Sequence, residues 1–242
     1  MKARCFYAFV ASVALLVLPA AAETADQWVA KARAFLGSES ALNAVTSVHY
    51  SGNLELQDKP SMPTEIIFQK PYRQHITIKK PKVIETTALD GYDAWRKQTN
   101  VENPAQWQVV LLDAGQIRRL RANTLENLSF YSSREMKGCV LELLGDVVVD
   151  GVFCKKIAFT HTGGVVFVRY FDKATGRLVK TETENGTEIR EEGEIVVNGV
   201  RFPKRVVNKA PNGDVTAISF DKIVVNEVFP VETFAVPSLQ AK

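Results

Sequence analysis

Residues 150–172 read DGVFCKKIAFTHTGGVVFVRYFD, two short apolar runs separated by a pair of glycines. Runs of this kind, rich in Val, Ile, Phe and Thr, continue from about Leu141 to Asn226. They are interrupted by Asp150-Gly151, Gly163-Gly164, Asn185-Gly186, Asn198-Gly199 and Asn212-Gly213. Asn-Gly and Asp-Gly tolerate the positive φ angles that two-residue hairpin turns require. The second half of the chain is therefore predicted to be an antiparallel meander. Its runs carry no cluster of residues at catalytic or metal-ligand spacing and no phosphate loop, which indicates binding rather than chemistry.

The first half begins with helical signals and continues as strands. Asp26 is a good helix cap, the apolar residues after it recur at helical spacing until Gly37, and Ser38 is placed to cap a second short helix. Alternation then predicts strands at Val48 to Leu56, Ile66 to Lys70, Tyr72 to Ile78, Val83 to Leu89 and Ala94 to Gln98. Pro60 and Pro63 are expected in the link before the second of these strands.

The stretch from Asp113 to Tyr131 lacks the alternation of apolar and polar residues that is typical of β-strands. Asp113 and Gln116 form a capping-box pattern, and Ile117, Leu120, Leu125, Leu128 and Tyr131 follow as an interrupted helical stripe. This segment is predicted to be a helix that packs on the sheet, on the face that the amino-terminal helix also covers.

Several strands are apolar on both faces, since Val165, Phe167 and Phe171 alternate with other apolar residues in the same strand. A sheet with one face in water shows a cleaner polar alternation. The fold class expected is therefore mostly β with a few helices, a curved antiparallel sheet with one face covered by helices. The space between sheet and helices is either an apolar cavity or tightly packed core, and the pattern alone leaves both open.

The first 22 residues have the composition of a secretory signal peptide. Lys2 and Arg4 precede an apolar stretch from Phe6 to Leu18, and small residues lie before the expected cleavage point. The apolar stretch is too short to span a membrane, and no later segment is long enough. We therefore expect residues 23–242 to be a single domain located in the periplasm. Its formal charge of +1 (28 basic minus 27 acidic residues) gives no electrostatic case for nucleic acid.

Cys139 and Cys154 remain in the mature chain, where an oxidising compartment favours pairing. A two-residue turn at Asp150-Gly151 places Cys154 opposite Val147, which leaves Cys139 about 26 Å further along the strand. A disulfide needs Cα atoms within about 7 Å. Two unpaired thiols are predicted, with a bridge as the alternative if Cys139 folds back.

Four segments follow one another along the chain: Phe68-Gln69-Lys70-Pro71-Tyr72-Arg73, Asp90-Gly91-Tyr92-Asp93-Ala94-Trp95, Phe171-Asp172-Lys173-Ala174-Thr175-Gly176, and the close from Phe220 through Pro230 to Pro237. In this order they resemble the outer-membrane lipoprotein-sorting proteins, a family of LolA-like periplasmic carriers. The resemblance implies an unclosed half β-barrel around helices that act as a lid, with a cavity for acyl chains. The family's basic residue before the proline is typically an Arg that holds the lid shut. Lys70 occupies that position here, and Lys lacks the planar donor fork of Arg.

The resemblance and the apolar pattern together give the candidate site residues. The cavity is expected to be lined by Trp28, Phe35, Phe68, Trp95, Trp107, Leu120 and Phe167, and the lid latch or rim by Lys70 and Arg73. Trp95 and Trp107 can equally be plain core. The basic row of Lys70, Arg73, Lys79, Lys80 and Lys82 can equally be a solvated surface that discourages strand aggregation.

No catalytic, metal or cofactor site is expected. His49, His75 and His161 lie on different predicted strands without ligand-spaced neighbours, and no Gly-x-Ser-x-Gly elbow occurs. The leading hypothesis is a monomeric, non-enzymatic carrier that delivers acyl chains of lipoproteins or lipids to the outer membrane, with an inner-membrane donor and an outer-membrane acceptor as candidate partners. The alternative is an envelope sensor or protein-interaction module on the same scaffold, and a third reading is a purely structural envelope protein.

Overall fold

The computed structural model describes residues 23–57, 59–132 and 135–237, and the expected signal peptide lies outside these ranges. Three α-helices and a 3₁₀ turn accompany fifteen strands in the described part. The helical elements are α1 (Ala25–Leu36), α2 (Glu39–Asn43), α3 (Ala114–Ser129) and η1 (Val231–Thr233). The strands are β1 (Ser47–Leu56), β2 (Met62–Gln69), β3 (Arg73–Lys79), β4 (Val83–Asp90), β5 (Asp93–Asn100), β6 (Trp107–Leu111), β7 (Val140–Val149), β8 (Val152–Thr160), β9 (Val166–Asp172), β10 (Leu178–Thr183), β11 (Glu188–Glu192), β12 (Ile195–Val197), β13 (Val200–Phe202), β14 (Arg205–Lys209) and β15 (Val215–Val225).

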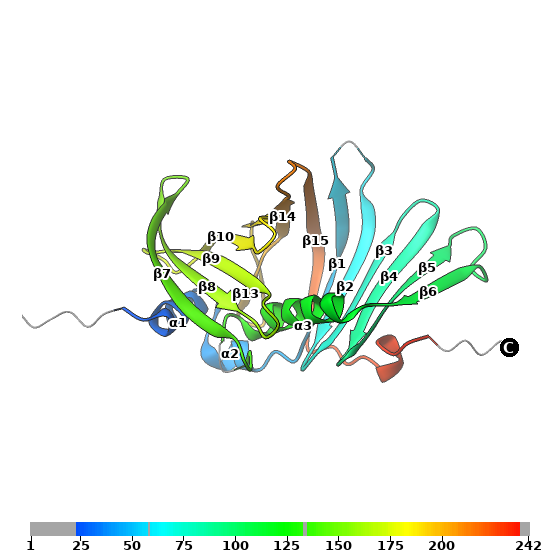
Figure 1. Ribbon diagram of the computed structural model, residues 1–242, viewed down its shortest axis with the longest axis horizontal. Helices are drawn as coiled ribbons and strands as arrows, with labels where there is room; N and C mark the ends of the chain where they lie inside the picture. Colours follow the sequence, from blue (N-terminus) through cyan, green and yellow to red (C-terminus); the bar gives the residue numbers. More distant parts are fainter. Residues whose placement is uncertain (1–22, 58, 133–134, 238–242) are drawn as a thin grey trace, which may run out of the picture.

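Thirteen of these strands form one antiparallel sheet in the order β6-β5-β4-β3-β2-β1-β15-β14-β11-β10-β9-β8-β7. The sheet bends strongly, and its edge strands β6 and β7 lie at opposite ends, so it is open rather than closed into a barrel (Figure 1). At its centre β1 pairs with β15, so strands from the two ends of the chain lie side by side. This arrangement confirms the predicted curved, unclosed sheet with helices on one face.

The helices begin where short polar side chains cap them. The cap of α1 is Thr24, which forms a capping box with Gln27, so the expectation that Asp26 caps it was wrong; Asp26 lies inside the first turn. Ser38 caps α2 as predicted. The predicted helix after Asp113 is also confirmed, because Asp113 and Gln116 form its capping box. Within the described ranges, no helix is long and apolar enough to cross a membrane.

All five turn dipeptides join consecutive strands, as the sequence predicted. At Asp150-Gly151 and Asn198-Gly199 both residues have positive φ angles, the requirement that makes Gly favourable there. The meander is interrupted once, because β11 pairs with β14 and the β12–β13 hairpin between them forms its own two-stranded sheet. Pro63 lies inside β2 rather than in the link before it; β2 begins to pair with β3 only at the next residue, Thr64.

The hairpin register also determines the arrangement of the cysteines. Val147 pairs with Cys154 as predicted, while Cys139 lies just before β7 starts, at the far end of the β7–β8 pairing. Both cysteines of the described chain are free. Burial raises the pKa of the Cys139 thiol to about 11, which leaves it largely protonated at neutral pH.

Two large hydrophobic clusters lie on the concave face of the sheet. The first, at the middle of the sheet, includes Val48, Tyr50, Phe68, Phe130, Phe202 and Phe220. The second lies between α1 and strands β8 and β9 and includes Trp28, Met136, Ile157, Phe159 and Phe171. A small third cluster of Val149, Cys154 and Tyr170 covers part of the opposite face, which accounts for the strands that are apolar on both sides.

Candidate functional site

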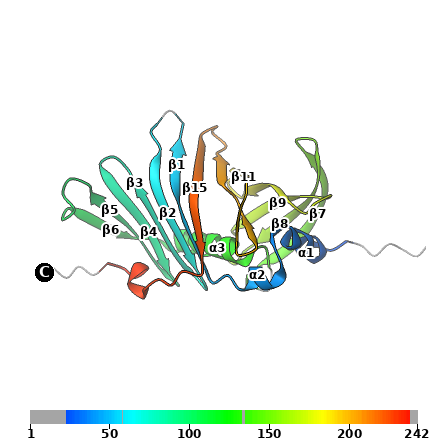
Figure 2. The same cartoon turned by 180° about the vertical axis from the view of Figure 1, so that it is seen from behind.

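An apolar cavity of about 300 Å³ lies between the middle of the sheet and α3. Figures 1 and 2 show α3 lying across the concave side of the sheet, near its middle. The helix contributes one wall, and strands from both halves of the chain contribute the rest. The apolar lining consists of Leu36, Tyr50, Ile66, Phe68, Ile76, Phe130, Tyr131, Phe167, Leu178, Ile189, Phe202, Pro203, Val206, Ile218 and Phe220. A volume of this size is at the lower end of the range for small-molecule sites.

A second, smaller space of about 90 Å³ adjoins the first near the end of α1 and the β12–β13 hairpin. The two spaces share Leu36, Leu178, Glu191, Arg201, Phe202 and Pro203. Gly37 and Gly199 meet beside this region, where a Cβ on Gly37 would lie 2.5 Å from the Gly199 carbonyl oxygen. Only glycine permits this close approach, which holds the hairpin against the α1–α2 corner.

One end of the cavity is polar and is built around Glu126 of α3. Its carboxylate accepts a hydrogen bond from Arg169 and pairs with the imidazole of His161, and all three side chains are buried. Burial alone would raise the pKa of Glu126, but the Arg169 charge and the hydrogen bonds from His161 and Arg169 outweigh it and lower that pKa. The group therefore forms a buried ion pair that joins α3 to β9.

The rest of the Arg169 guanidinium is surrounded by aromatic rings. Its central carbon lies 4.5 Å from the ring centre of Phe159 and 4.8 Å from that of Tyr131. Nε and Nη1 of Arg169 are buried without a hydrogen-bond partner in the described structure. The positive charge is thus balanced by Glu126 and by ring faces rather than by solvent.

Glu191 of β11 is the second carboxylate of the cavity wall. Residues alternate along this strand, so Ile189 and Glu191 face the cavity while their neighbours face outward. Glu191 is exposed to solvent, although neighbouring protein groups lie around its carboxyl. Burial raises its pKa, and the more distant charge of Arg169 only partly opposes that shift.

Polar contacts attach α3 to both halves of the sheet. Toward β3, Thr124 and Asn123 donate hydrogen bonds of 3.3 Å to Oε1 of the fully buried Gln74. Toward the β4–β5 turn, the Arg121 guanidinium lies 3.8 Å from the Tyr72 ring centre and 3.9 Å from that of Tyr92. Together with the Glu126–Arg169 pair on β9, these contacts make α3 a strap across the cavity.

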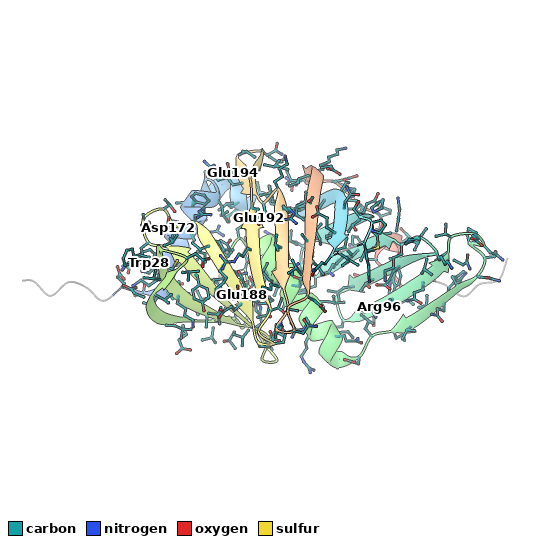
Figure 3. All side chains as sticks on the ribbon, turned by 90° about the horizontal axis from the view of Figure 1, so that it is seen from above. Trp28, Arg96, Asp172, Glu188, Glu192 and Glu194 are labelled. Carbon is teal, nitrogen blue, oxygen red and sulfur yellow. The ribbon has the colours of Figure 1, made fainter. Side chains whose placement is uncertain are left out.

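The structure places two of the seven predicted cavity residues, Phe68 and Phe167, on the wall of the large space, and a third, Phe35, on the wall of the smaller one. Trp28 packs in the second cluster, and it lies at the opposite end of the sheet from β5, which carries Arg96 and Trp95 (Figure 3). The Trp95 indole donates a 2.9 Å hydrogen bond to the carbonyl of Phe234.

The two remaining predicted cavity residues also lie elsewhere. Trp107 is half-buried on the edge strand β6, with the Lys97 ammonium 4.6 Å from its ring centre. Leu120 is half-buried on α3, outside the cavity lining.

The predicted latch residues make different contacts. The Lys70 ammonium lies 2.6 Å from the Glu135 carboxylate, in the segment that follows α3. Arg73 instead donates a 2.9 Å hydrogen bond to Asp90 on the neighbouring strand and stacks on Phe234. Lys70 therefore links the sheet to the chain beyond α3.

Sequence reasoning missed the four charged residues that line the cavity, Glu126, Arg169, Glu191 and Arg201. Arg169 carried a usable signal, because it occupies an inward position between Phe167 and Phe171 in an otherwise apolar strand. Glu126 fits only loosely into the helical stripe of Leu125 and Leu128. Glu191 lies in an acidic strand whose two faces carry similar residues, so the sequence does not show which face points inward. No group of three His, Cys, Asp or Glu residues is placed to hold a metal ion in the described ranges.

Comparison with known proteins identifies the fold. No protein-family model and no curated protein matches the sequence. Among solved structures, a LolA superfamily protein from Nitrosomonas europaea is 16% identical, with a TM-score of 0.59 over 89% of this chain and 99% of that one. A Vibrio parahaemolyticus domain, classed as an outer membrane lipoprotein-sorting protein, has a TM-score of 0.59 at 10% identity, over 87% of this chain and 97% of its own. A DUF1329 family protein from Desulfovibrio piger has a TM-score of 0.57 at 12% identity, over 87% and 97%. The chain has a LolA-like fold.

Proposed function

We propose that this protein is a periplasmic carrier that holds acyl chains of lipoproteins or lipids in the cavity under α3 and delivers them to the outer membrane. The observation that carries the proposal is the cavity itself, an aromatic-lined space of about 300 Å³ between a curved sheet and a helix. A LolA-like fold and a chain start typical of a secretory signal peptide support the location.

The energetics of an apolar cavity suit reversible loading. Each methylene moved from water to an apolar site contributes about 0.8 kcal/mol, so a single chain of moderate length gains several kcal/mol. No covalent chemistry is required for binding at this strength. Release requires only that a partner compete for the chain or displace the strap.

The size of the cavity implies that loading a long chain moves part of the wall. Two elements are suited to move: α3, which is attached by discrete polar contacts, and the β12–β13 hairpin, which lies outside the main sheet. Lys70–Glu135 is an ion pair with both side chains about 30% exposed, so its loss removes a contact of the chain beyond α3 at small cost. The end of α3 itself is held by the buried Arg33, which donates 2.8 Å hydrogen bonds to the carbonyls of Ser129 and Phe130.

The experiment that tests the proposal is native mass spectrometry of the chain from residue 23, exported to a bacterial periplasm and purified without detergent. We expect extra mass that organic extraction identifies as fatty acid, phospholipid or lipopeptide. A ligand-free mass, together with failure to bind added acyl ligands, would overturn the carrier proposal.

A second candidate is an envelope sensor or protein-interaction module. Val148 and Phe153 face each other across the β7–β8 hairpin with 55% and 72% of their surfaces exposed, near the hairpin tip. Large exposed apolar side chains in contact often mark an interaction surface. This candidate predicts an empty cavity and a crosslinked partner that the double variant V148S/F153S no longer captures.

A further inference from the structure

The β12–β13 hairpin lies against the cavity through apolar contacts. In the described ranges, the hydrogen bonds and ion pairs of residues 194–202 all lie within the hairpin itself. Its contacts with the rest of the protein are made by side chains such as Phe202, whose ring centre lies 6.2 Å from that of Tyr50 and 6.0 Å from that of Phe130. Moving the hairpin therefore uncovers apolar surface but breaks no polar contact to the helices.

The other wall that could move, α3, is attached in a different way. The buried Arg33 donates 2.8 Å hydrogen bonds to the carbonyls of Ser129 and Phe130, and Glu126 forms its buried pair with Arg169. Displacing α3 leaves these groups without partners, and an acyl chain supplies no replacement. Apolar surface that the hairpin uncovers, in contrast, can be covered again by an acyl chain.

The hairpin has a fixed base and a tip without hydrogen bonds to its neighbours in the described structure. At the base, the Lys204 amide donates a 3.1 Å hydrogen bond to the Glu192 carbonyl, which ties the two ends of the excursion to the main sheet. Gly193 follows with a φ angle of +64°, and Pro203 precedes Lys204 on the returning chain. At the tip, Gly199 only touches the α1–α2 corner. The base is thus suited to act as a hinge.

The smaller space of about 90 Å³ lies along this hairpin. Its lining joins Gly193, Glu194 and Arg201 of the hairpin segment to Phe35 and Arg177. The charged residues of this lining are exposed to solvent, as expected at the mouth of a cavity rather than at its closed end. The Arg201 guanidinium also lies 5.4 Å from the centre of the Phe35 ring, across the gap between the hairpin and α1.

We propose that the β12–β13 hairpin is the gate of the cavity. It turns about Gly193 and Pro203, separates from the α1–α2 corner and admits an acyl chain through the smaller space, and it opens before α3 moves. The inference rests on the proposed carrier function and adds the route by which the cargo enters and leaves.

The test fixes the tip of the hairpin with a disulfide. A Cβ on Gly199 would lie 3.8 Å from the Cβ of Ala41 on α2, the usual separation in a disulfide. Ala41→Cys/Gly199→Cys is made with Cys139→Ser, and stopped-flow fluorescence follows uptake and displacement of dansyl-labelled undecanoic acid on delipidated protein. We expect both rates to fall at least tenfold in the oxidised form and to recover on reduction.

A matched crosslink fastens the other wall. In Gly138→Cys/Thr162→Cys the Cβ atoms would lie 3.9 Å apart, and Gly138 has a φ angle of +80° where Gly199 has +78°, so both crosslinks carry similar backbone strain. This one ties the chain beyond α3 to the β8–β9 turn and, also made with Cys139→Ser, should leave both rates unchanged when oxidised.

A second pair of variants tests the gate without a crosslink. Val200→Ala removes a fully buried contact near the tip and should raise both rates several-fold, whereas Val196→Ala, at a position 57% exposed, should not. Equal rates in this pair, an oxidised hairpin crosslink without effect, or equal slowing by both crosslinks would overturn the gate and leave the carrier proposal standing. Failure of the wild type to bind the probe would remove the carrier proposal, and the gate with it.

Discussion

Aromatic residues of the two large hydrophobic clusters differ in how completely they are packed, according to whether they border the cavity. In the cluster between α1 and strands β8 and β9, Phe159 and Phe171 have no exposed surface at all. In the cluster at the middle of the sheet, Phe130 and Phe220 each keep 7%. The cavity accounts for the difference, since it borders Phe130 and Phe220, and Tyr131 and Phe167 of the other cluster, which also border it, keep 7% as well. The part of the concave face away from the cavity is thus packed completely, and the part around the cavity keeps space at the expense of contacts.

The largest effect should come from truncating an aromatic residue that lies away from the cavity. Phe171→Ala removes a fully buried ring and should lower the free energy of unfolding by about 3–5 kcal/mol. Phe220→Ala should cost less, because its ring already borders empty space. Urea denaturation of both variants measures the contrast. Equal losses would show that the residues around the cavity are packed as tightly as those away from it.

The Glu126–Arg169 pair joins the two regions and should be nearly as sensitive. Glu126→Gln leaves the buried Arg169 charge without its partner, which should cost about 3 kcal/mol. The pKa of Glu126 is lowered in the folded protein, so its stabilisation is present above its unfolded pKa of about 4.3 and lost as the pH falls below it. Thermal unfolding between pH 6 and pH 3 should therefore show a shallower acid loss in Glu126→Gln than in the wild type. Parallel curves would mean that the pair adds no pH-dependent stability.

Filling the cavity should separate binding from stability. Ile218→Trp places a large ring in the space of about 300 Å³ and should weaken acyl binding at least tenfold, with a change in stability of about 1 kcal/mol or less. Val207→Trp, on the outward side of β14, is the matched control and should bind like the wild type. Uptake of a fluorescent fatty amide measures both. Undiminished uptake by Ile218→Trp would place the ligand elsewhere.

The smallest effect concerns the contact beyond α3. Lys70→Met should change the free energy of unfolding by less than about 1 kcal/mol, because the Lys70–Glu135 pair is partly exposed. The dissociation rate of a bound acyl ligand should rise several-fold if this pair restrains the strap. Lys70→Glu combined with Glu135→Lys should restore the slower rate, measured by stopped-flow displacement. An unchanged rate in Lys70→Met would exclude the pair as a latch.

Local signals predicted most of the sheet but only part of the site. The Asn-Gly and Asp-Gly turns and the Asp113 capping box depend on a few adjacent residues, so the hairpins and α3 could be predicted from local sequence. The β12–β13 hairpin was predicted as a hairpin, yet its exclusion from the main sheet follows from the long-range pairing of β11 with β14. The sequence of either strand alone does not predict such a pairing.

The same distinction applies to the cavity residues. Phe68 and Phe167 were readable because each faces inward on a strand whose alternation is clear. The environment of Trp95 depends on the chain after β15, because the Phe234 carbonyl accepts a hydrogen bond from the Trp95 indole N–H. The sequence near residue 95 does not predict where that distant segment lies. Glu191 required the register of β11 against β14 before its inward direction could be known.

The pairing of β1 with β15 has a consequence for how the chain folds. The centre of the sheet joins Ser51 to Lys222, residues separated by most of the described chain. Hairpins such as β3–β4 and β7–β8 need only local loop closure and should form early. The central β1–β15 pairing can form only when the last strand is in place. A chain that ends before Val215 would leave β1 and β14 as adjacent unpaired edges at the middle of the sheet, where strand-to-strand aggregation begins most readily.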